Sequence, residues 1–132
     1  MQWTYKGEEF TSEMIGDNIG FVYIITNLEN NKKYIGQKLF KNKAFKTVKK
    51  KRKRITVESN WKDYFGSSLQ LQEDVANSNI SNFKREILYL CKTKGMMNYL
   101  ELEEQVLRKV LFDDSYYNAF IGGKIHKRHV VK

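Results

Sequence analysis

Residues 20–36 read Gly-Phe-Val-Tyr-Ile-Ile-Thr-Asn-Leu-Glu-Asn-Asn-Lys-Lys-Tyr-Ile-Gly. Residues 20–26 are rich in β-branched and aromatic side chains, which predicts a strand. Asparagine tolerates the left-handed backbone conformation and bonds its own backbone, so residues 27–31 predict a turn. Residues 32–36 predict the returning strand of a hairpin, which places Tyr23 and Tyr34 on paired strands.

The segments that follow predict one more strand and two helices. Ser67, with Gln70 three residues later, has the pattern of a capping box, so a short helix is expected through about residue 76. Its apolar residues, expected to be partly buried, are Leu69, Leu71 and Val75. Residues 83–91 alternate well enough for a third strand, and a longer helix is expected from Asn98 to about residue 112. The fold class expected is α+β, with a three-stranded antiparallel sheet flanked by helices.

Positive charge is concentrated in one segment. The chain has 132 residues, with 24 lysines and arginines against 15 acidic residues, a net charge of +9. Residues 41–54 hold nine of the basic residues and no acidic one, so the rest of the chain is neutral, with 24 − 9 = 15 basic residues. A block of like charges repels itself and predicts a segment that stays mobile until a polyanion neutralises it. The functional interpretation is contact with nucleic-acid phosphates, and the alternatives are a solubilising surface loop or a targeting signal.

Composition excludes several other classes. The length suits one domain, and 41% hydrophobic with 14% aromatic residues argues against a disordered chain. The longest uncharged apolar run, residues 21–25, is far shorter than the roughly 20 residues that span a bilayer, so no membrane partner is expected. Residues 1–6 lack the apolar stretch of a signal peptide. A single cysteine, Cys91, allows no internal disulfide and no four-cysteine zinc site, and we expect a reducing, cytoplasmic location.

The two tyrosine motifs are the strongest functional signal in the sequence. Phe21-Val22-Tyr23 followed by Tyr34-Ile35-Gly36 resembles the paired motifs of the GIY-YIG nuclease superfamily, although Phe21 stands where that family usually has glycine. Further similarity follows in order at residues 64–68, at residues 83–88, in an acidic helix and at Tyr117-Asn118, and it is greatest to small phage-borne, homing-type members. The resemblance implies a nuclease domain over residues 20–123 with a basic insertion at 41–54. Residues 1–19 would be an N-terminal extension and residues 124–132 a basic tail.

The resemblance also implies metal-dependent hydrolysis of DNA phosphodiester bonds with Mg²⁺ or Mn²⁺. Such hydrolysis needs an activated water, a divalent metal ion and a cation near the scissile phosphate. Tyr23 would help to activate the water and Tyr34 would assist it, while Gly36 would let the backbone approach DNA closely. The family cation after the second tyrosine is often arginine. Here Lys38 is the nearest candidate, and Arg85 on the third strand is another.

The metal ligand is expected to be a glutamate on the long helix. At about 100° per residue, the apolar positions centre near Glu103 and lie opposite Glu101. A carboxylate on an apolar face needs a metal ion or a partner, which favours Glu103. The phage-type resemblance favours Glu101 instead, because such helices open with Tyr-x-Glu and carry a glutamine four residues on, here Gln105. Both remain candidates, with Glu101 preferred, and Glu104 ranks third.

The remaining site candidates are one asparagine and a set of DNA-binding residues. The resemblance implies that Asn118 supports the active-site geometry, although asparagine before a loop is also ordinary turn chemistry. His126 and His129 lack a nearby acid or second cysteine, so a phosphate contact is expected there rather than a metal site. The expected DNA contacts are Lys49, Lys50, Lys51, Arg52, Lys53, Arg54, Ser67, Ser68, Lys127 and Arg128.

The function predicted from these features is a metal-dependent endonuclease that nicks or cuts double-stranded DNA, of homing or phage type, acting in the host cytoplasm if phage-encoded. A homodimer would allow both strands to be cut, and a monomer is the alternative. Phe21 and the missing arginine motivate a second interpretation, a non-catalytic DNA-binding or regulatory protein on the same fold. An RNA-binding module is a third, but the usual sheet motif is absent. Base readout would come from residues 1–19, the basic segment or the tail, because no helix-turn-helix or zinc finger is recognisable.

Overall fold

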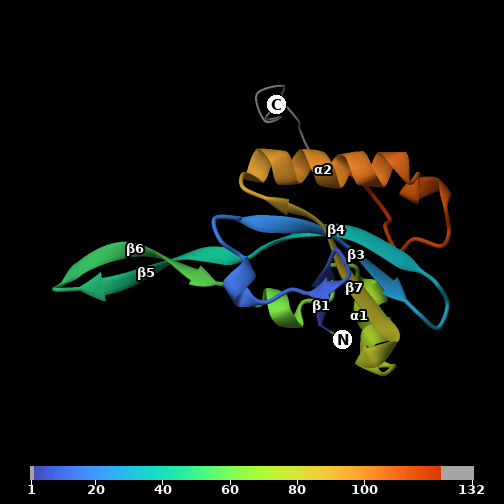
Figure 1. Ribbon diagram of the computed structural model, residues 1–132, viewed down its shortest axis with the longest axis horizontal. Coiled ribbons are helices and arrows are strands. Elements are labelled where there is room, and N and C mark those ends of the chain that lie inside the picture. The colour runs from blue at the N-terminus through green and yellow to red at the C-terminus, as the bar shows by residue number, and fades with distance from the viewer. Residues whose placement is uncertain (1, 123–132) are drawn as a thin grey trace.

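A five-stranded mixed sheet forms the centre of the molecule (Figure 1). The computed structural model describes residues 2–122, without the side chains of residues 44–46. The sheet consists of β1 (Trp3–Tyr5), β2 (Glu8–Glu9), β3 (Gly20–Asn27), β4 (Lys33–Leu39) and β7 (Phe83–Cys91), in the order β2-β1-β7-β3-β4. A separate hairpin consists of β5 (Lys41–Val48) and β6 (Lys51–Glu58), and the helices are α1 (Leu69–Ala76) and α2 (Lys94–Leu107). Short 3-10 helices occur at Ser12–Met14, Trp61–Asp63, Ile80–Asn82 and Val110–Phe112.

The α+β class and the tyrosine hairpin are confirmed. β3 and β4 pair antiparallel with Tyr23 opposite Gly36 and Ile25 opposite Tyr34. β7 pairs antiparallel with the other side of β3, as expected for the third strand. The register shifts between Val22 and Tyr23, where Leu88 is the extra residue on β7. In the strand order of the sheet, β4 is an edge strand, and it carries Tyr34 next to β3, which carries Tyr23.

The expected number of strands is wrong, because residues before 20 also join the sheet. β1 runs parallel to β7 with Trp3 opposite Arg85, and β2 pairs with β1. Trp3 is fully buried, with its ring 5.0 Å from that of Phe21 and 5.1 Å from that of Tyr23. Its indole N–H donates to the carbonyl of Trp61 at 2.7 Å. Burial of one large aromatic side chain thus fixes a strand whose three residues, although aromatic or β-branched, are too few to predict a strand from the sequence.

The basic segment, residues 41–54, lies in paired strands rather than in the mobile segment that its charge predicted. β5 and β6 form an antiparallel hairpin with Val48 opposite Lys51, and Lys49 and Lys50 make the turn with φ angles of 51° and 64°. Two positive φ angles in a two-residue turn match the right-handed twist of hairpin strands. The β-branched residues of these strands favour extended backbone, while the charged side chains remain exposed. Electrostatic repulsion along the sequence therefore does not prevent strand pairing.

α1 ends at Ala76, as predicted, whereas α2 begins and ends earlier than the prediction. α1 is capped by Ser68, whose hydroxyl accepts from the amide of Leu71, and Leu69 is 78% exposed instead of partly buried. α2 begins at Lys94 rather than Asn98, because the Thr93 hydroxyl caps it, and ends at Leu107. These capping bonds set where each helix starts.

The predicted apolar face of α2 is also wrong. Met97 and Gln105 are its buried residues, whereas Val106 and Leu107 are 53% and 69% exposed. Gln105 donates to the carbonyl of Ile35 on β4, and Glu104 accepts from the hydroxyl of Tyr89 on β7. Polar side chains with partners on the sheet therefore determine which side of the helix faces it.

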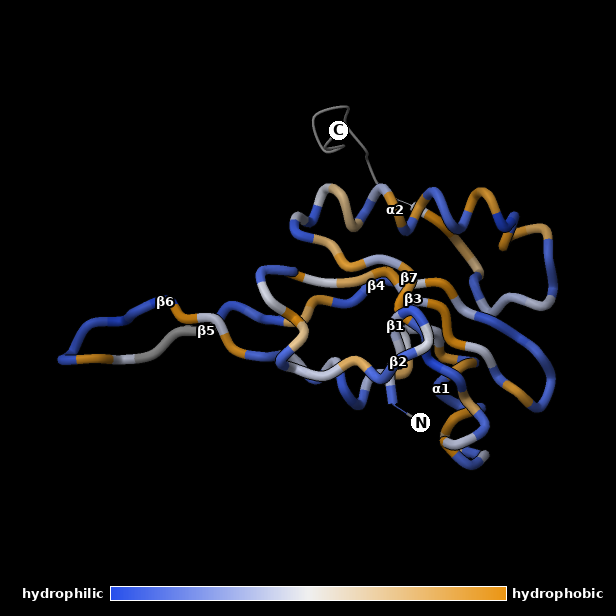
Figure 2. Tube along the Cα trace, viewed as in Figure 1, coloured by the Kyte–Doolittle hydropathy of each residue, from blue (hydrophilic) through white to orange (hydrophobic). Residues whose placement is uncertain are grey.

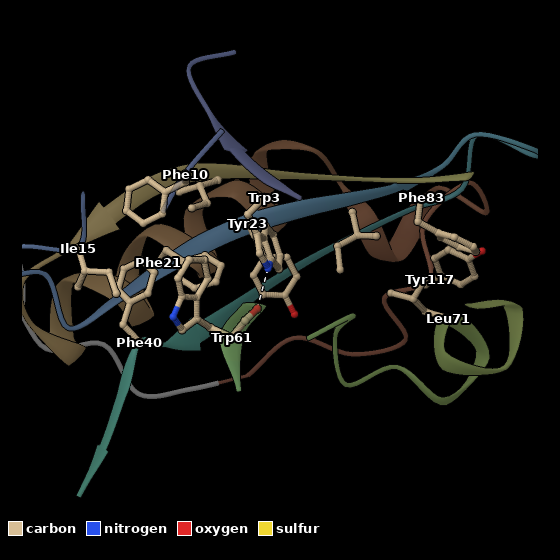
Figure 3. Packing of buried hydrophobic residues seen from close by; sticks show 12 residues of the cluster. Trp3, Phe10, Ile15, Phe21, Tyr23, Phe40, Trp61, Leu71, Phe83 and Tyr117 are labelled. Carbon is tan, nitrogen blue, oxygen red and sulfur yellow. Dashed lines mark hydrogen bonds between the residues drawn. The ribbon is translucent and has the colours of Figure 1, made fainter. Parts of the chain in front are cut away.

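Hydrophobic clusters lie on both faces of the sheet. Figure 3 shows the larger cluster, in which Trp3, Phe21 and Phe40 pack with Trp61 and, further along, Leu71 of α1. The second cluster, which includes Val22 and Met97, lies between the sheet and α2. The central strands of the sheet, which lie between the two clusters, are rich in hydrophobic residues (Figure 2). No helix in residues 2–122 is long and apolar enough to cross a membrane.

Candidate active site

A pocket of about 760 Å³ lies beside β4 and joins residues from distant parts of the chain. It is lined by Tyr23 and Tyr34 of the hairpin, by the start of α1, by α2, and by residues 117–122. The lining residues with polar side chains are Tyr23, Tyr34, Gln37, Ser67, Ser68, Gln70, Glu101, Gln105, Tyr117 and Asn118. Six of the predicted site residues are therefore brought together in one place: Tyr23, Tyr34, Ser67, Ser68, Glu101 and Asn118.

The rings of Tyr23 and Tyr34 both lie close to the Cα atom of Gly36. A Cβ atom on Gly36 would lie 2.7 Å from Cζ of Tyr23 and 2.9 Å from Cε2 of Tyr34. Real Cβ atoms do not approach other atoms so closely, so a side chain at this position would displace one or both rings. The expectation that glycine is needed for close approach of DNA is not what this geometry indicates. Gly36 gives space to the tyrosine rings themselves.

Both tyrosine hydroxyls hold their protons tightly. Burial raises the pKa of Tyr23 well above its ordinary value, and the neighbouring hydroxyls of Tyr64 and Tyr34 raise it further. Burial also raises the pKa of Tyr34, although the hydrogen bond with Ser67 acts in the opposite direction. The Tyr34 hydroxyl and Ser67 Oγ are 2.8 Å apart. Without a cation in the pocket, both tyrosines are neutral phenols near pH 7.

Glu101 is the glutamate that faces the tyrosines. It is half-buried on α2 and lines the pocket, and its charge contributes to the raised pKa values of Tyr23 and Tyr34. Burial raises the pKa of the Glu101 carboxyl to about 7. No hydrogen bond or ion pair joins this carboxylate to another residue within the described part of the chain. The side chain of Glu103 instead contacts the Tyr99 hydroxyl and does not line the pocket.

The two candidate cations lie outside this pocket. The ammonium of Lys38 sits 4.3 Å from the ring centre of Tyr64, and burial lowers its pKa. Tyr64 in turn packs edge-on against Tyr23, with ring centres 6.1 Å apart. Lys38 is therefore one aromatic ring away from the catalytic candidate, at the edge of a second pocket of about 370 Å³.

Arg85 is built into the core rather than the pocket. Its side chain is 4% exposed, and its Nη1 donates to the carbonyls of Lys62 and Tyr64, each at 2.9 Å. The guanidinium also lies 4.2 Å from the ring centre of Phe65 and 4.9 Å from that of Trp3. Burial lowers its pKa to about 10. These contacts tie residues 62–65 to the sheet, which is a structural arrangement for this arginine.

Asn118 pairs with the edge strand as another strand would. Its Oδ1 accepts from the Ile35 amide at 3.0 Å, and its Nδ2 donates to the Ile35 carbonyl at 2.9 Å. The neighbouring Tyr117 donates to Asp74 of α1 at 2.6 Å and accepts from Asn27 at 3.0 Å. Residues 117–122 are thereby held against β4, where they form one wall of the pocket.

Three residues near the tyrosines were not among the predicted site residues. Tyr64 packs on Tyr23, Gln105 binds the edge strand, and Gln37 lines both pockets. Tyr64 lies two residues before Gly66, within residues 64–68, and the similarity of that segment to the nuclease family was the signal that could have identified it. Lys127 and Arg128 lie outside the described residues, and the predicted contacts at residues 49–54 lie in the β5–β6 hairpin.

A divalent metal ion fits the pocket at Glu101. No group of three or more histidine, cysteine, aspartate or glutamate side chains gathers within residues 2–122. Mg²⁺ does not need such a cage, because it is commonly held by one or two carboxylates, several waters and substrate phosphates. A half-buried carboxylate with a raised pKa and no protein partner gains most from a cation. Glu101 therefore has the chemistry of a single protein ligand.

The chain belongs to a GIY-YIG family of putative endonucleases. The family described as "Putative endonuclease segE, GIY-YIG domain" matches residues 3–121. The chain is also similar to "Putative endonuclease segD" of Enterobacteria phage T4, at 32% identity over 107 residues. That similarity covers 78% of this chain and 38% of the relative, so the chain spans less than half of the relative's length. No solved structure matches the chain.

Proposed function

We propose that this protein is an endonuclease that uses Mg²⁺ or Mn²⁺ to hydrolyse phosphodiester bonds of double-stranded DNA. The observation that carries this proposal is the position of Glu101. An unpartnered, half-buried carboxylate faces two neutral tyrosine hydroxyls across one open pocket. A family membership that names endonucleases supports the same reaction.

Each residue of the pocket has a separate role in the proposed hydrolysis. Glu101 would hold the metal ion, which when bound would supply positive charge near the scissile phosphate. Tyr23 positions the attacking water, and because burial raises its pKa, it acts as a base only when a nearby cation lowers that pKa. Tyr34, held by Ser67, orients the same water or the phosphate. Asn118 keeps the wall of the pocket in place.

Positive charge on the phosphate comes from Lys38 in this proposal rather than from Arg85. Lysine acts as a compact point charge and its flexible stem can reach past the Tyr64 ring. Arg85 already donates to two backbone carbonyls, so moving it to the phosphate would leave both carbonyls unsatisfied. The basic hairpin, together with Lys127 and Arg128 of the tail, would bind flanking phosphates.

The departure from the family glycine at Phe21 does not argue for a non-catalytic protein. Phe21 is fully buried and packs against Phe40 and Trp3, with ring centres 4.7 and 5.0 Å away. It does not line the pocket of the tyrosines. The substitution therefore changes the core beside Tyr23, whose ring centre is 5.8 Å from that of Phe21, without placing Phe21 in the pocket lining.

Each chain contributes one set of the proposed catalytic residues, so one binding event would produce a nick, and a break in both strands would need two events or a homodimer. We propose the reducing cytoplasm of a host cell as the compartment. The single cysteine, Cys91, is buried, and its pKa is raised to about 11. Such a thiol is unreactive.

Incubation with supercoiled plasmid DNA, with Mg²⁺ or with EDTA, tests the proposed function. We expect nicked or linear product only with the metal ion. Gel-shift measurements in EDTA serve as the binding control. Binding without cleavage at any Mg²⁺ or Mn²⁺ concentration would favour the non-catalytic DNA-binding alternative.

A further inference from the structure

The β5–β6 hairpin projects from the body of the protein as a free two-stranded ribbon (Figure 1). Every residue of β6 except Ile55 is exposed. The base of the ribbon is fixed, because the amide of Ser59 donates to the carbonyl of Phe40 at 2.7 Å. The Glu58 carboxylate there accepts from Ser12 and from the indole of Trp61, each at 2.7 Å. The ribbon is thus anchored to the core at one end, and β6 is exposed to solvent along most of its length.

The two faces of the ribbon differ in chemistry. Residues directly opposite each other in antiparallel strands share a face, and alternate residues of one strand point to opposite faces. Thr47 is opposite Arg52 and Lys43 is opposite Thr56, so the first face carries Thr47, Arg52, Arg54, Lys43 and Thr56, with Lys41 and Glu58 at its base. The second face carries Val48, Lys51, Lys53, Ile55 and Val57, with Asn42 at its base. Both arginines of the ribbon therefore lie on one face, together with two threonines.

Arginine and threonine read base edges, and lysine, although it can also bind guanine, does so as a compact point charge without the planar fork of arginine. Arginine binds the O6 and N7 atoms of guanine with two hydrogen bonds in the major groove. Threonine bonds base edges and contacts the thymine methyl group. Two strands about 4.8 Å apart, with their side chains, fit the major groove, which is about 12 Å wide. The minor groove of undeformed B-DNA, about 6 Å wide, and the deep, narrow major groove of double-stranded RNA are too narrow for such a ribbon, and strands that bind in the minor groove do so in bent DNA.

We propose that the β5–β6 ribbon lies in the major groove of duplex DNA with its arginine face on the base edges. The lysines of the other face and of the tip contact the phosphates that border the groove. In this proposal the ribbon reads the DNA sequence, and it does not only add affinity for any DNA through its positive charge. The groove assignment stands on the ribbon alone, and the position of the reading relative to the cut rests on the proposed nuclease function.

The covalent connection between ribbon and pocket sets where the reading occurs. Lys41 is five residues past Gly36, and Val48 is twelve residues past it. At about 3.3 Å per residue, the ribbon covers a region about 16 to 40 Å from the tyrosines. At about 3.4 Å per base pair, this corresponds to roughly 5 to 12 base pairs. The ribbon leaves the sheet in one direction (Figure 1), so the reading is confined to one side of the cut.

A binding selection from random DNA duplexes in EDTA tests the proposal without any need for cleavage. Three proteins are compared: the wild type, the double variant R52K/R54K, and the double variant K51A/K53A. The first variant keeps the charge but cannot form the forked hydrogen bonds of arginine. The second removes two charges from the opposite face of the same strand. All four positions are exposed, and thermal unfolding of each variant checks that the fold is unchanged.

We expect the wild type to select a short sequence containing guanine, in which methylation of guanine N7 interferes with binding. R52K/R54K should lose about 5- to 150-fold in preference at each base pair that an arginine reads, with an unchanged salt dependence. K51A/K53A should bind all sequences more weakly and reduce the slope of log K against log salt by about 1.8, while the selected sequence stays the same.

Two results would overturn the proposal: no selected sequence for the wild type, or the same sequence selected by R52K/R54K. Equal binding of duplex RNA would do so as well. Because the selection uses EDTA, a protein that reads sequence but never cuts would contradict only the proposed function. A protein that cuts DNA without selecting a sequence through the ribbon would contradict only this inference.

Discussion

Replacing Glu101 by glutamine should stabilise the protein in the absence of metal and remove its response to metal. The carboxyl has its pKa raised from 4.5 to about 7 by burial, a difference of about 2.5. Each pKa unit corresponds to 1.36 kcal/mol, which gives a ceiling of about 3 kcal/mol. Glu101 is only half-buried, so solvent screening lowers the expected effect to about 1–2 kcal/mol. Glutamine has nearly the same shape and carries no charge that burial penalises.

The effect has a defined dependence on pH. The folded protein binds the Glu101 proton more tightly than the unfolded chain, so this group supports folding fully below about pH 4.5. That support is lost as pH rises through about 7. Wild type and E101Q should therefore unfold at similar temperatures near pH 4.5 and differ at pH 8. For a chain of this size, 1–2 kcal/mol corresponds to roughly 3–10 °C in the midpoint of unfolding.

Thermal unfolding in EDTA and in saturating Mg²⁺ measures both parts of the prediction. At pH 8 in EDTA, E101Q should unfold at a higher temperature than wild type. Added Mg²⁺ should stabilise the wild type and not E101Q, because only the carboxylate binds the ion. E103Q is the matched control, because Glu103 lies two residues along the same helix and outside the pocket lining, and it should behave as wild type. Equal midpoints for wild type and E101Q at pH 8, or the same Mg²⁺ response in both, would refute the reasoning.

Three further substitutions test the supporting structure. G36A forces a Cβ atom into the space of the Tyr23 and Tyr34 rings, so we expect a loss of about 1–3 kcal/mol in the free energy of unfolding and a lower cleavage rate, measured by denaturant melts and plasmid nicking. N118D replaces the Nδ2 donor by an oxygen that repels the Ile35 carbonyl, so it should cost about 1–3 kcal/mol, and a wild-type melting curve would disprove the strand-like pairing. R85A leaves the carbonyls of Lys62 and Tyr64 without a donor and should cost about 2–4 kcal/mol, while cleavage per folded molecule stays near wild type; a catalytic role would instead lower cleavage and leave stability intact.

The tyrosine hairpin could be predicted from sequence because its determinants are local. β-branched strands and an asparagine turn are encoded in residues that are neighbours in the chain, and the observed register follows from them. The strand β1 could not be predicted in this way. It pairs in parallel with β7, more than 80 residues later, and its stability depends on burial of Trp3 rather than on any pattern in its own sequence.

The face of α2 shows why a helical wheel failed. Periodicity placed Glu103 at the centre of the apolar face and Glu101 on the opposite side, and an apolar face normally packs on the core. Here Gln105 and Glu104 bind groups of the sheet, so the polar side faces inward and brings Glu101 to the pocket. The family resemblance indicated Glu101 because it carried this tertiary information, which composition and spacing do not contain.

The two cation candidates differ for a similar reason. Lys38 follows the second tyrosine on the same strand, so its position near the tyrosines was predictable. Arg85 lies on the face of β7 that packs against Trp3, as Tyr23 does. The loop of residues 62–65, however, folds over its side chain and accepts its hydrogen bonds. Nothing in the local sequence indicates that loop. A charged residue predicted for a site can therefore be used by the fold instead.

The central claim is that the pocket around Tyr23 is a site of DNA hydrolysis. The most direct test is the single-turnover rate of plasmid cleavage in Mg²⁺ by wild type and Y23F, at protein concentrations that give equal DNA occupancy. Tyr23 lines the pocket and its ring is buried in the core, so Y23F keeps the packing and removes only the hydroxyl. We predict cleavage by wild type and a loss of at least about 100-fold in Y23F, with binding in EDTA unchanged. Cleavage by Y23F at the wild-type rate would contradict the account.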